Sequence, residues 1–348
     1  MEKTYVSTFI SGFQKLVERN IINIFKDVEI IKVYDGLIIY KTKQHDKVLK
    51  LPFINNTYLY LGMTSSSINS KLDNEISKII KSVKIDFNTI KYVLNHKKYR
   101  NFKILTLDKN QPVKTDFKIL ENLESKIITN MNITLNTKNP DIDFIFLRRT
   151  EGDVLFLLKL TYDRISEKQL SKGSLRPELA YLLLTLADIK DTDIVMDPFC
   201  GSGSIPKQLV KYFKYNMCFA SDIDDDSIEK LKTEYKSNNK KLFIKKRDAL
   251  DLNYFEEGFI NKIITDPPWN IYNYTGDNYD EFYYNMLKEA ERILVNKGTM
   301  VVLMGNIIDF EKALNKINNL LKIEEYHILV NGKKANVYKL EKNSENIY

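Results

Sequence analysis

The chain has 348 residues, of which 43% are hydrophobic, 11% aromatic and 28% charged. This balance is typical of globular domains, so it excludes collagen-like, coiled-coil and disordered classes, and the length predicts two or three domains. The two Cys do not supply a disulfide framework, and the three His lie far apart in the sequence. We therefore expect no metal site of the Cys/His type.

The two halves of the chain differ in charge. Residues 1–165 contain 27 Lys and Arg against 18 Asp and Glu, whereas residues 166–348 contain 26 against 28. A basic half joined to a nearly neutral one favours a module that binds a polyanion such as nucleic acid, although a Lys-rich genome would give the same bias. The start of the chain does not resemble a signal peptide, and no apolar run reaches the roughly 18 residues of a membrane span. We expect a cytoplasmic protein with no membrane segment.

The first 162 residues predict two small α/β units. In the first, over 1–65, we expect a helix at 9–25 and strands at 28–33 and 36–40. A polar stretch at 62–70 is typical of a loop, and the spacing of apolar residues changes after it. The second unit, over 66–162, is predicted to contain helices at 71–83 and 116–130, strands at 102–107, 143–147 and 154–160, and a hairpin turn at 151–153.

A third domain, over 181–348, follows a linker at 163–180. Its strands and helices alternate, which predicts a doubly wound sheet, and a final hairpin would add antiparallel strands at one edge. We expect strands at 193–196, 217–221, 242–246, 262–265 and 299–304, helices at 204–214, 225–238, 280–296 and 310–321, and the hairpin at 323–330 and 335–340.

A Gly-x-Gly pattern follows the first of these strands. Gly201 and Gly203 allow positive φ and a close approach of a ligand to the backbone. The loop has neither the Gly-Lys-Ser/Thr of a nucleotide-phosphate site nor the full GxGxxG of nicotinamide enzymes. Asp197 would repel a pyrophosphate but pair with an ammonium group, which favours an amino-acid-bearing cofactor such as S-adenosylmethionine. A tight turn that binds nothing is the alternative. The candidate cofactor residues of this loop are Asp197, Pro198, Phe199, Gly201, Ser202 and Gly203.

The next two strands end in further candidate cofactor residues. Asp222, with Ile223 beside it, lies where a carboxylate accepts hydrogen bonds from both ribose hydroxyls, and Asp224 is the second choice. Asp248, with Ala249 beside it, follows the third strand and would accept a hydrogen bond from an adenine amino group. A surface loop acid is the alternative for Asp248.

The strand at 262–265 leads directly into the tetrad Asp266-Pro267-Pro268-Trp269. The two prolines stiffen the backbone, and the aromatic side chain offers a face on which a flat ring stacks. An acidic oxygen and exposed carbonyls would accept hydrogen bonds from an exocyclic amine and orient it toward an electrophile. These four residues are the catalytic candidates, and core packing is the alternative for Trp269, the only Trp.

Together these motifs resemble the class I S-adenosylmethionine-dependent methyltransferases that methylate exocyclic amines of bases. The matching stretches, in order, are DPFCGSGSI, SDID, RDA and DPPW, and SLRPELA at 174–180 resembles the segment that closes over the methionine end of the cofactor. The resemblance covers about residues 171–340. It implies a Rossmann-like domain, S-adenosylmethionine as cofactor, and cofactor contacts from Arg176 and Pro177.

The N-terminal half resembles a THUMP domain, which binds RNA in tRNA-modifying enzymes. The similarity lies in NPDID at 139–143, FLRR at 146–149 and the strand at 155–160. It implies a ferredoxin-like unit over 1–65 and a THUMP domain over 66–162. A THUMP unit joined to this catalytic domain resembles the tRNA guanine-N2 methyltransferases, with the GSGSIP and SLRPELA segments most similar to the guanine-6 enzymes.

Three alternatives stay open at this point: a guanine-10 enzyme, an adenine-N6 methyltransferase acting on RNA or DNA, and a non-catalytic RNA-binding protein. No protein partner is implied. The candidate RNA contacts are basic residues of the N-terminal half, for which a solvated surface or strand edge is the competing interpretation. They are Lys97, Lys98, Arg100, Arg148 and Arg149.

Overall fold

The computed structural model describes residues 2–95, 97–162, 174–235, 239–269, 279–330 and 332–343. The chain forms two compact units. The first comprises Met1–Phe9 and Glu18–Arg164, and the second comprises Ile10–Val17 and Ile165–Tyr348. Within the linker expected over 163–180, residues 163–173 lie outside the described part of the chain.

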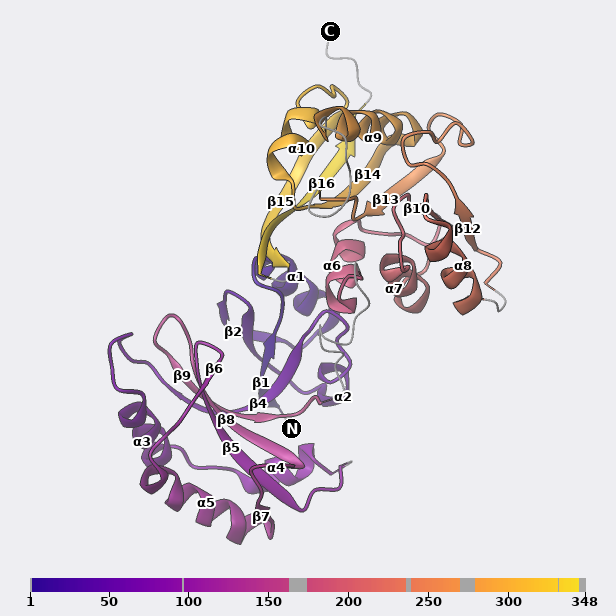
Figure 1. Cartoon of the computed structure of the whole chain (residues 1–348). Helices are drawn as coiled ribbons and strands as arrows, with labels where there is room; N and C mark the ends of the chain where they lie inside the picture. Colours follow the sequence, from indigo (N-terminus) through magenta and orange to yellow (C-terminus); the bar gives the residue numbers. More distant parts are fainter. Residues whose placement is uncertain are drawn as a thin grey trace. The chain divides into compact units, whose positions relative to one another are not determined.

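The N-terminal unit is built on a nine-stranded sheet, drawn in indigo to pink in Figure 1. The strand order is β2-β3-β1-β4-β9-β8-β5-β6, with β7 beside β5. The strands are β1 (Lys3–Thr8), β2 (Glu29–Tyr34), β3 (Leu37–Thr42), β4 (Asn56–Thr64), β5 (Asn101–Asp108), β6 (Gln111–Val113), β7 (Thr134–Leu135), β8 (Ile142–Arg148) and β9 (Val154–Lys159). Because β4 pairs with β9, the two segments expected as separate α/β units contribute to one continuous sheet.

The helices of this unit cover the sheet and close its core. They are α1 (Gln14–Ile24), which crosses the division between the units, α2 (His45–Val48), α3 (Leu72–Ser82), α4 (Phe87–Val93) and α5 (Phe117–Met131). Asp116 caps α5 by accepting a hydrogen bond from the Lys118 N–H at 3.0 Å. Phe146 and Phe156 stack on β8 and β9 with ring centroids 4.5 Å apart, so aromatic packing fixes the centre of the sheet.

The C-terminal unit has a seven-stranded sheet in the order β12-β11-β10-β13-β14-β16-β15. The strands are β10 (Ile194–Asp197), β11 (Met217–Asp222), β12 (Leu242–Lys246), β13 (Ile260–Thr265), β14 (Leu294–Met304), β15 (Leu320–Val330) and β16 (Lys333–Lys342). The first five pair in parallel, whereas β16 pairs antiparallel with both β14 and β15. The doubly wound sheet with an antiparallel terminal hairpin, predicted from the sequence, is confirmed.

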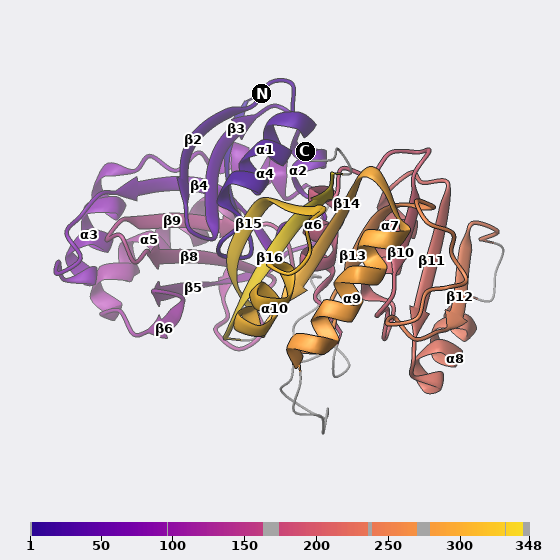
Figure 2. The same cartoon turned by 90° about the horizontal axis from the view of Figure 1, so that it is seen from above.

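Helices lie on both faces of this sheet. In Figures 1 and 2, α9 and α10 cover one face, and α6, α7 and α8 lie on the other. These helices are α6 (Pro177–Leu186), α7 (Ser204–Tyr212), α8 (Asp225–Glu234), α9 (Tyr279–Ile293) and α10 (Ile307–Leu314). The strand order reverses between β10 and β13, and open α/β sheets bind ligands at the carboxyl ends of the strands at such a point. The fold therefore places the glycine loop and the proline tetrad at its ligand-binding edge.

Across the described ranges, no helix is both long and apolar enough to cross a bilayer. The same ranges bring together no group of three or more His, Cys, Asp or Glu side chains arranged to hold a metal ion.

Candidate active site

The glycine loop leaves the carboxyl end of β10 and turns directly into α7. Its backbone carbonyl partners include Ser221, which accepts from the Cys200 N–H at 2.9 Å, and Cys200, which accepts from the Gly203 N–H at 2.7 Å. Gly203 has φ +80°, and an added Cβ would lie 2.3 Å from Leu231 of α8. Glycine is therefore required here by both backbone conformation and packing.

Asp197 connects the glycine loop to the proline tetrad. Its Oδ1 accepts hydrogen bonds from the Thr265 hydroxyl at 2.8 Å and from the Phe199 N–H at 3.2 Å. Because Thr265 ends β13 directly before Asp266, this carboxyl group joins the ends of two neighbouring strands. Burial raises the pKa of Asp197 to about 8, with the Thr265 hydrogen bond opposing the shift. Its role is thus partly internal, beyond the ammonium pairing expected from the sequence.

Asp222 bridges the glycine loop to the next strand. Its Oδ2 accepts from the Gly201 N–H at 2.8 Å, and its Oδ1 accepts from the Asp224 N–H at 3.0 Å. A carboxylate held by two backbone donors keeps further lone pairs for hydroxyl groups of a ligand. Ile223 beside it is 65% exposed, so it offers an apolar surface at the same strand end. Asp224 caps α8 by accepting from the Ser227 N–H, which leaves Asp222 as the better ribose candidate.

Asp248 lies one strand further along and is exposed, while Ala249 is buried. The Oδ1 of Asp248 accepts a hydrogen bond from the Leu250 N–H at 2.9 Å, which shapes the loop after β12. This contact is compatible with both interpretations of Asp248, since its second oxygen is not part of the turn.

The segment before α6 packs on the glycine loop. The Ser174 and Ser202 hydroxyls are 2.8 Å apart, and the Leu175 N–H donates to the Ser204 hydroxyl at 3.1 Å. Pro177 is the first residue of α6, where a missing N–H costs nothing. Arg176 pairs with the buried Glu178 at 3.6 Å. The predicted closing segment therefore borders the loop, and Ser204 is a site residue that the motifs did not single out.

The proline tetrad is held by contacts on two sides. The Trp269 Nε1–H donates to Asp266 Oδ1 at 2.8 Å and to the Leu303 carbonyl of β14 at 3.3 Å. The Tyr283 hydroxyl of α9 donates to the Pro268 carbonyl at 2.8 Å. Pro267 is buried and Pro268 exposed, whereas Asp266 and Trp269 are half-buried. Burial raises the pKa of Asp266 to about 7, and the indole hydrogen bond opposes the shift.

Besides Ser204, sequence reasoning missed two supporting residues of this site, Thr265 and Tyr283. Thr265 and Tyr283 lie in elements whose apolar spacing predicts only core positions. Their hydroxyl groups find partners across 68 and 15 residues of chain. Hydrogen bonds between residues so far apart in the chain depend on the fold, so no local sequence pattern predicts them.

The residues at the strand ends fit S-adenosylmethionine by the chemistry of their donors and acceptors. The glycine loop and the N-terminus of α7 suit close approach of the cofactor, Asp222 retains acceptor capacity for hydroxyls, and Ile223 supplies an exposed apolar surface. Asp266 and Trp269 lie one strand away, joined to the loop through Thr265 and Asp197. The site therefore combines a cofactor cradle with an acceptor and an aromatic ring suited to an amine-bearing base.

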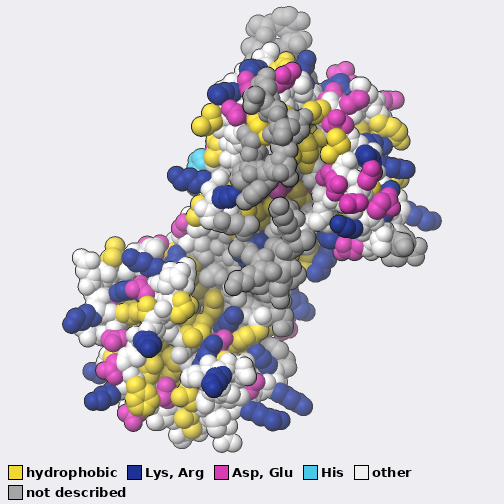
Figure 3. Space-filling model, in the orientation of Figure 1, with side chains coloured by type: hydrophobic (Ala, Val, Ile, Leu, Met, Phe, Trp, Pro, Cys, Tyr) yellow, Lys and Arg dark blue, Asp and Glu magenta, His cyan; other side chains and the backbone are white. Residues whose placement is uncertain are grey.

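In the N-terminal unit, the basic residues at 97–100 lie at the surface. Lys98 and Arg100 are exposed. Lys97 places its Nζ 3.4 Å from the centroid of the Tyr162 ring, so it contacts an aromatic side chain of the same unit. Lys and Arg side chains are also spread over the visible face of this unit in Figure 3.

Arg148 and Arg149 take part in internal contacts instead. Arg148 donates to both carboxylate oxygens of Asp108 and to the Ser70 carbonyl at 2.8 Å. Arg149 is 8% exposed and donates to the Asp35 carbonyl at 2.6 Å. These contacts favour the interpretation of both arginines as structural groups at a strand end, because little of either guanidinium remains for a phosphate.

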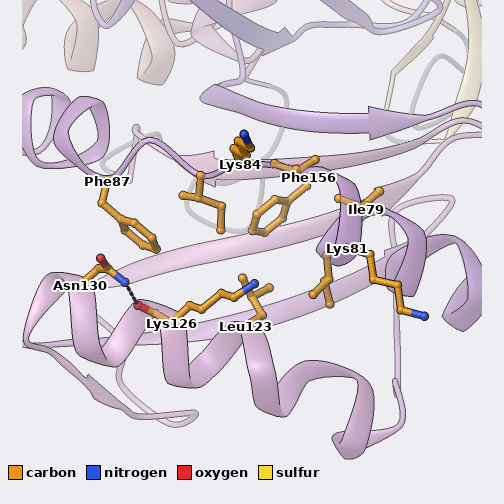
Figure 4. Close-up of a pocket in the computed structure, with 11 residues that line it drawn as sticks. Ile79, Lys81, Lys84, Phe87, Leu123, Lys126, Asn130 and Phe156 are labelled. Carbon is orange, nitrogen blue, oxygen red and sulfur yellow. Dashed lines mark hydrogen bonds between the residues drawn. The ribbon is translucent and has the colours of Figure 1, made fainter.

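A cavity of about 430 Å³ lies between α3, α5 and β9. Figure 4 shows apolar side chains toward its middle, among them Phe87, Leu123 and Phe156, and the lysines Lys81, Lys84 and Lys126 around it. None of the sequence candidates lines this cavity, so it is separate from the predicted RNA contacts.

Residues 164–336 match the family model described as UPF0020, RMKL-like methyltransferase domain. A probable tRNA (guanine(10)-N2)-dimethyltransferase of Methanothermococcus thermolithotrophicus is 32% identical over 116 residues, covering 31% of this chain and 70% of the relative. The tRNA (guanine(6)-N2)-methyltransferase of Methanocaldococcus jannaschii is 26% identical over 204 residues, covering 48% of this chain and 53% of the relative. The chain spans about half the length of most of the curated relatives that it matches.

Among solved structures, TrmN from Thermus thermophilus superposes with a TM-score of 0.77 and 18% sequence identity, covering 98% of this chain and 100% of the other. At this identity the likeness shows the fold. It extends over both units, whereas the family model matches only the C-terminal part.

Proposed function

The chain belongs to the UPF0020 family of methyltransferases, and because its relatives there include tRNA guanine-N2 enzymes, we propose that it methylates the exocyclic N2 of a guanosine in tRNA. S-adenosylmethionine supplies the electrophilic methyl group when bound. The observation that carries this proposal is the hydrogen bond from Thr265 to Asp197, which joins the proline tetrad to the glycine loop. An amine acceptor and a methyl-donor cradle are thereby built on adjacent strand ends.

The proposed roles follow from the contacts of each residue. Asp222, the loop from Asp197 to Gly203, Arg176 and Pro177 hold the cofactor, and Ile223, Asp248 and Ala249 border its adenine. Asp266 and the Pro267 carbonyl accept the two N–H bonds of the guanine amine. This orients the nitrogen lone pair toward the methyl group, and positioning of this kind supplies a large part of the rate.

A carboxylate at Asp266 also stabilises the positive charge that develops on the nitrogen as the new N–C bond forms. The proton leaves the nitrogen after methyl transfer, so Asp266 needs no strong basicity. Trp269 supplies the face on which the base stacks. A guanine that is paired in a stem must leave the helix to reach this site, which costs a few kcal/mol of stacking and pairing.

For the N-terminal unit we propose RNA binding by a ferredoxin-like segment over 1–65 and a THUMP domain over 66–162. The excess of basic residues in this half supports the assignment, since phosphate contacts supply much of the affinity for RNA. Lys97, Lys98 and Arg100 are the proposed contacts. The linker at 163–180 then leads to the catalytic domain at 181–348.

We propose guanine 6 of the acceptor stem as the target, because the GSGSIP loop and the SLRPELA segment are most similar to the guanine-6 enzymes. A second candidate is guanine 10, which is favoured by the relative of 32% identity named for that position. The two candidates share the reaction and differ in the nucleotide presented to the same site.

The test uses the purified full chain, labelled S-adenosylmethionine and unmodified tRNA transcripts, followed by nucleoside analysis and mapping of the modified position. We expect N2-methylguanosine at position 6. The same product at position 10 would retain the reaction and change the target, and N6-methyladenosine would overturn the base assignment. Failure to bind S-adenosylmethionine would contradict the proposed methyltransferase activity and favour the alternative of a non-catalytic RNA-binding protein.

The Asp266→Ala variant tests the role of the acceptor within the same assay. We expect it to abolish turnover while largely preserving affinity for tRNA, because Asp266 contacts the reacting amine and contributes little to the rest of the RNA interface. Equal loss of turnover and tRNA affinity in a folded variant would contradict this role.

A further inference from the structure

Gly305 lies directly after β14, under the ring of Trp269. A Cβ added at this position would lie 2.2 Å from Trp269 Cε3 and 2.4 Å from Cδ2. Both distances are far below the 3.5–4.0 Å at which carbon atoms pack favourably. The backbone of Gly305 thus occupies the space where any other residue would place a side chain against the indole.

The indole is fixed in its own plane as well as on this face. Its N–H points at both Asp266 Oδ1 and the Leu303 carbonyl of β14, two residues before Gly305. Tyr283, which is fully buried, holds the Pro268 carbonyl next to it. The position of the ring is therefore set by the tetrad on one side and by the end of β14 on the other.

We infer that Gly305 is a positioning residue: the missing side chain lets the Trp269 indole lie flat against the end of β14, where its N–H holds Asp266 and only one face of the ring is open to the base. The inference rests on the proposed function, because it makes the Trp269 ring a surface of fixed position on which the substrate base stacks. It also explains why the ring stays half-buried instead of turning freely into solvent.

A methyl group at position 305 would move the ring by at least about 1 Å to restore normal carbon contacts. The indole N–H would then lose its hydrogen bond to Asp266, because the Nε1–Oδ1 distance of 2.8 Å would increase beyond hydrogen-bonding range. A misplacement of this size in a reacting group costs on the order of 100-fold in rate. The glycine loop lies on other strands, so the cofactor cradle keeps its contacts.

The chain offers a direct test because Trp269 is its only Trp. In Gly305→Ala we expect the intrinsic fluorescence to shift to longer wavelength and to be quenched more readily by acrylamide, as the ring moves into solvent. We expect kcat to fall on the order of 100-fold, with the Kd for S-adenosylhomocysteine unchanged within about twofold. Gly258→Ala is the control for an added methyl group: its Cβ meets nothing within 4 Å, so its cost is confined to the backbone at φ +66°, and we expect it to leave the Trp269 emission and kcat unchanged.

A second measurement tests the contact itself through thermal unfolding. Gly305→Ala should lower Tm in the wild-type background but not in Trp269→Ala, where no ring meets the new methyl group. If Gly305→Ala alone does not fold, the double variant should. Unchanged fluorescence and kcat in Gly305→Ala, or equal destabilisation in both backgrounds, would overturn the inference. The fluorescence and unfolding measurements do not depend on methyl transfer. A wild-type chain without activity would therefore contradict the proposed function without deciding the role of Gly305.

Discussion

At the scale of single residues, the candidate site contains two acids on adjacent strand ends with different partners. Asp197 shares its oxygen with Thr265 and Phe199, whereas Asp266 receives the Trp269 indole N–H. Burial raises the pKa of both acids, and the nearby charge of Asp266 raises the pKa of Asp197 further. Asp197 thus serves the geometry of the loop, while Asp266 keeps an oxygen for a substrate amine.

The first prediction concerns the pH dependence of turnover. The pKa of Asp266 is raised to about 7, so its carboxyl group is largely protonated below that pH and ionised above it. The ionised form is the better acceptor for the amine and for its developing charge. We therefore expect kcat to rise with pH, tenfold per unit well below pH 7, and to level off above it. Single-turnover rates between pH 5.5 and 9 measure this.

Asp266→Asn is the control for that profile. The amide oxygen still accepts from the amine but does not titrate, so residual turnover should be lower than in the wild type and flat across neutral pH. If turnover of Asp266→Asn still rises with pH near neutrality, the titrating group is a residue other than Asp266.

The roles of some other residues could not be predicted from the sequence, for a physical reason. Arg148 and Arg149 form a basic pair at the end of a strand, and either phosphate contact or internal pairing fits that pattern. Their partners, Asp108, Ser70 and Asp35, are separated from them by 40, 78 and 114 residues. Only the assembled sheet shows that the guanidinium groups are already engaged.

At the scale of elements, the glycine loop contains two glycines with different requirements. Gly201 has φ +45° and its added Cβ would meet only Asp222 Oδ2, at 4.0 Å, whereas Gly203 has φ +80° and would press into Leu231. We expect Gly201→Ala to cost about 1 kcal/mol from backbone strain, and Gly203→Ala to cost roughly 2–4 kcal/mol because overpacking is added to it. Urea unfolding with the unliganded protein measures the difference.

Cofactor binding gives the second measurement for this pair. We expect Gly203→Ala to weaken the binding of S-adenosylhomocysteine more than Gly201→Ala does. In Gly203→Ala, movement of α8 away from the new methyl group displaces the start of α7 as well. Calorimetric Kd values that are equal for the two variants would contradict the packing argument.

The elements themselves were predicted unevenly. In the C-terminal unit, buried strands alternate with amphipathic helices, so local patterns predict both the elements and the parallel sheet. The helix expected at 9–25 begins at Gln14 instead, because Gly12 has φ +97° and breaks the backbone before it. Strands β1 and β4 were not predicted, and the pairing of β4 with β9 joins residues about 100 positions apart. Pairing at that separation has no local signature.

At the scale of the whole molecule, charge separates the two proposed tasks. The basic half supplies the sequence-independent attraction to RNA, and the nearly neutral half contains the proposed chemistry. Among the candidate RNA contacts, Lys98 and Arg100 are exposed, while Arg148 is tied to Asp108 and Ser70. The same half thus contains basic residues of two kinds, which mutation distinguishes.

The last prediction follows from that distinction. Replacing Lys98 and Arg100 together by Ala should weaken tRNA binding roughly tenfold and reduce the slope of log K against log salt by about 1–2, since each phosphate contact releases about one counterion. Tm and the affinity for S-adenosylhomocysteine should stay unchanged. Arg148→Ala should instead lower the Tm, because Asp108 and the Ser70 carbonyl lose their partner. Lys214→Ala with Lys230→Ala, two exposed lysines of the C-terminal unit, removes the same charge as a control. If this control weakens tRNA binding as much as the Lys98/Arg100 pair, net charge alone explains the effect and the proposed contact at 97–100 fails.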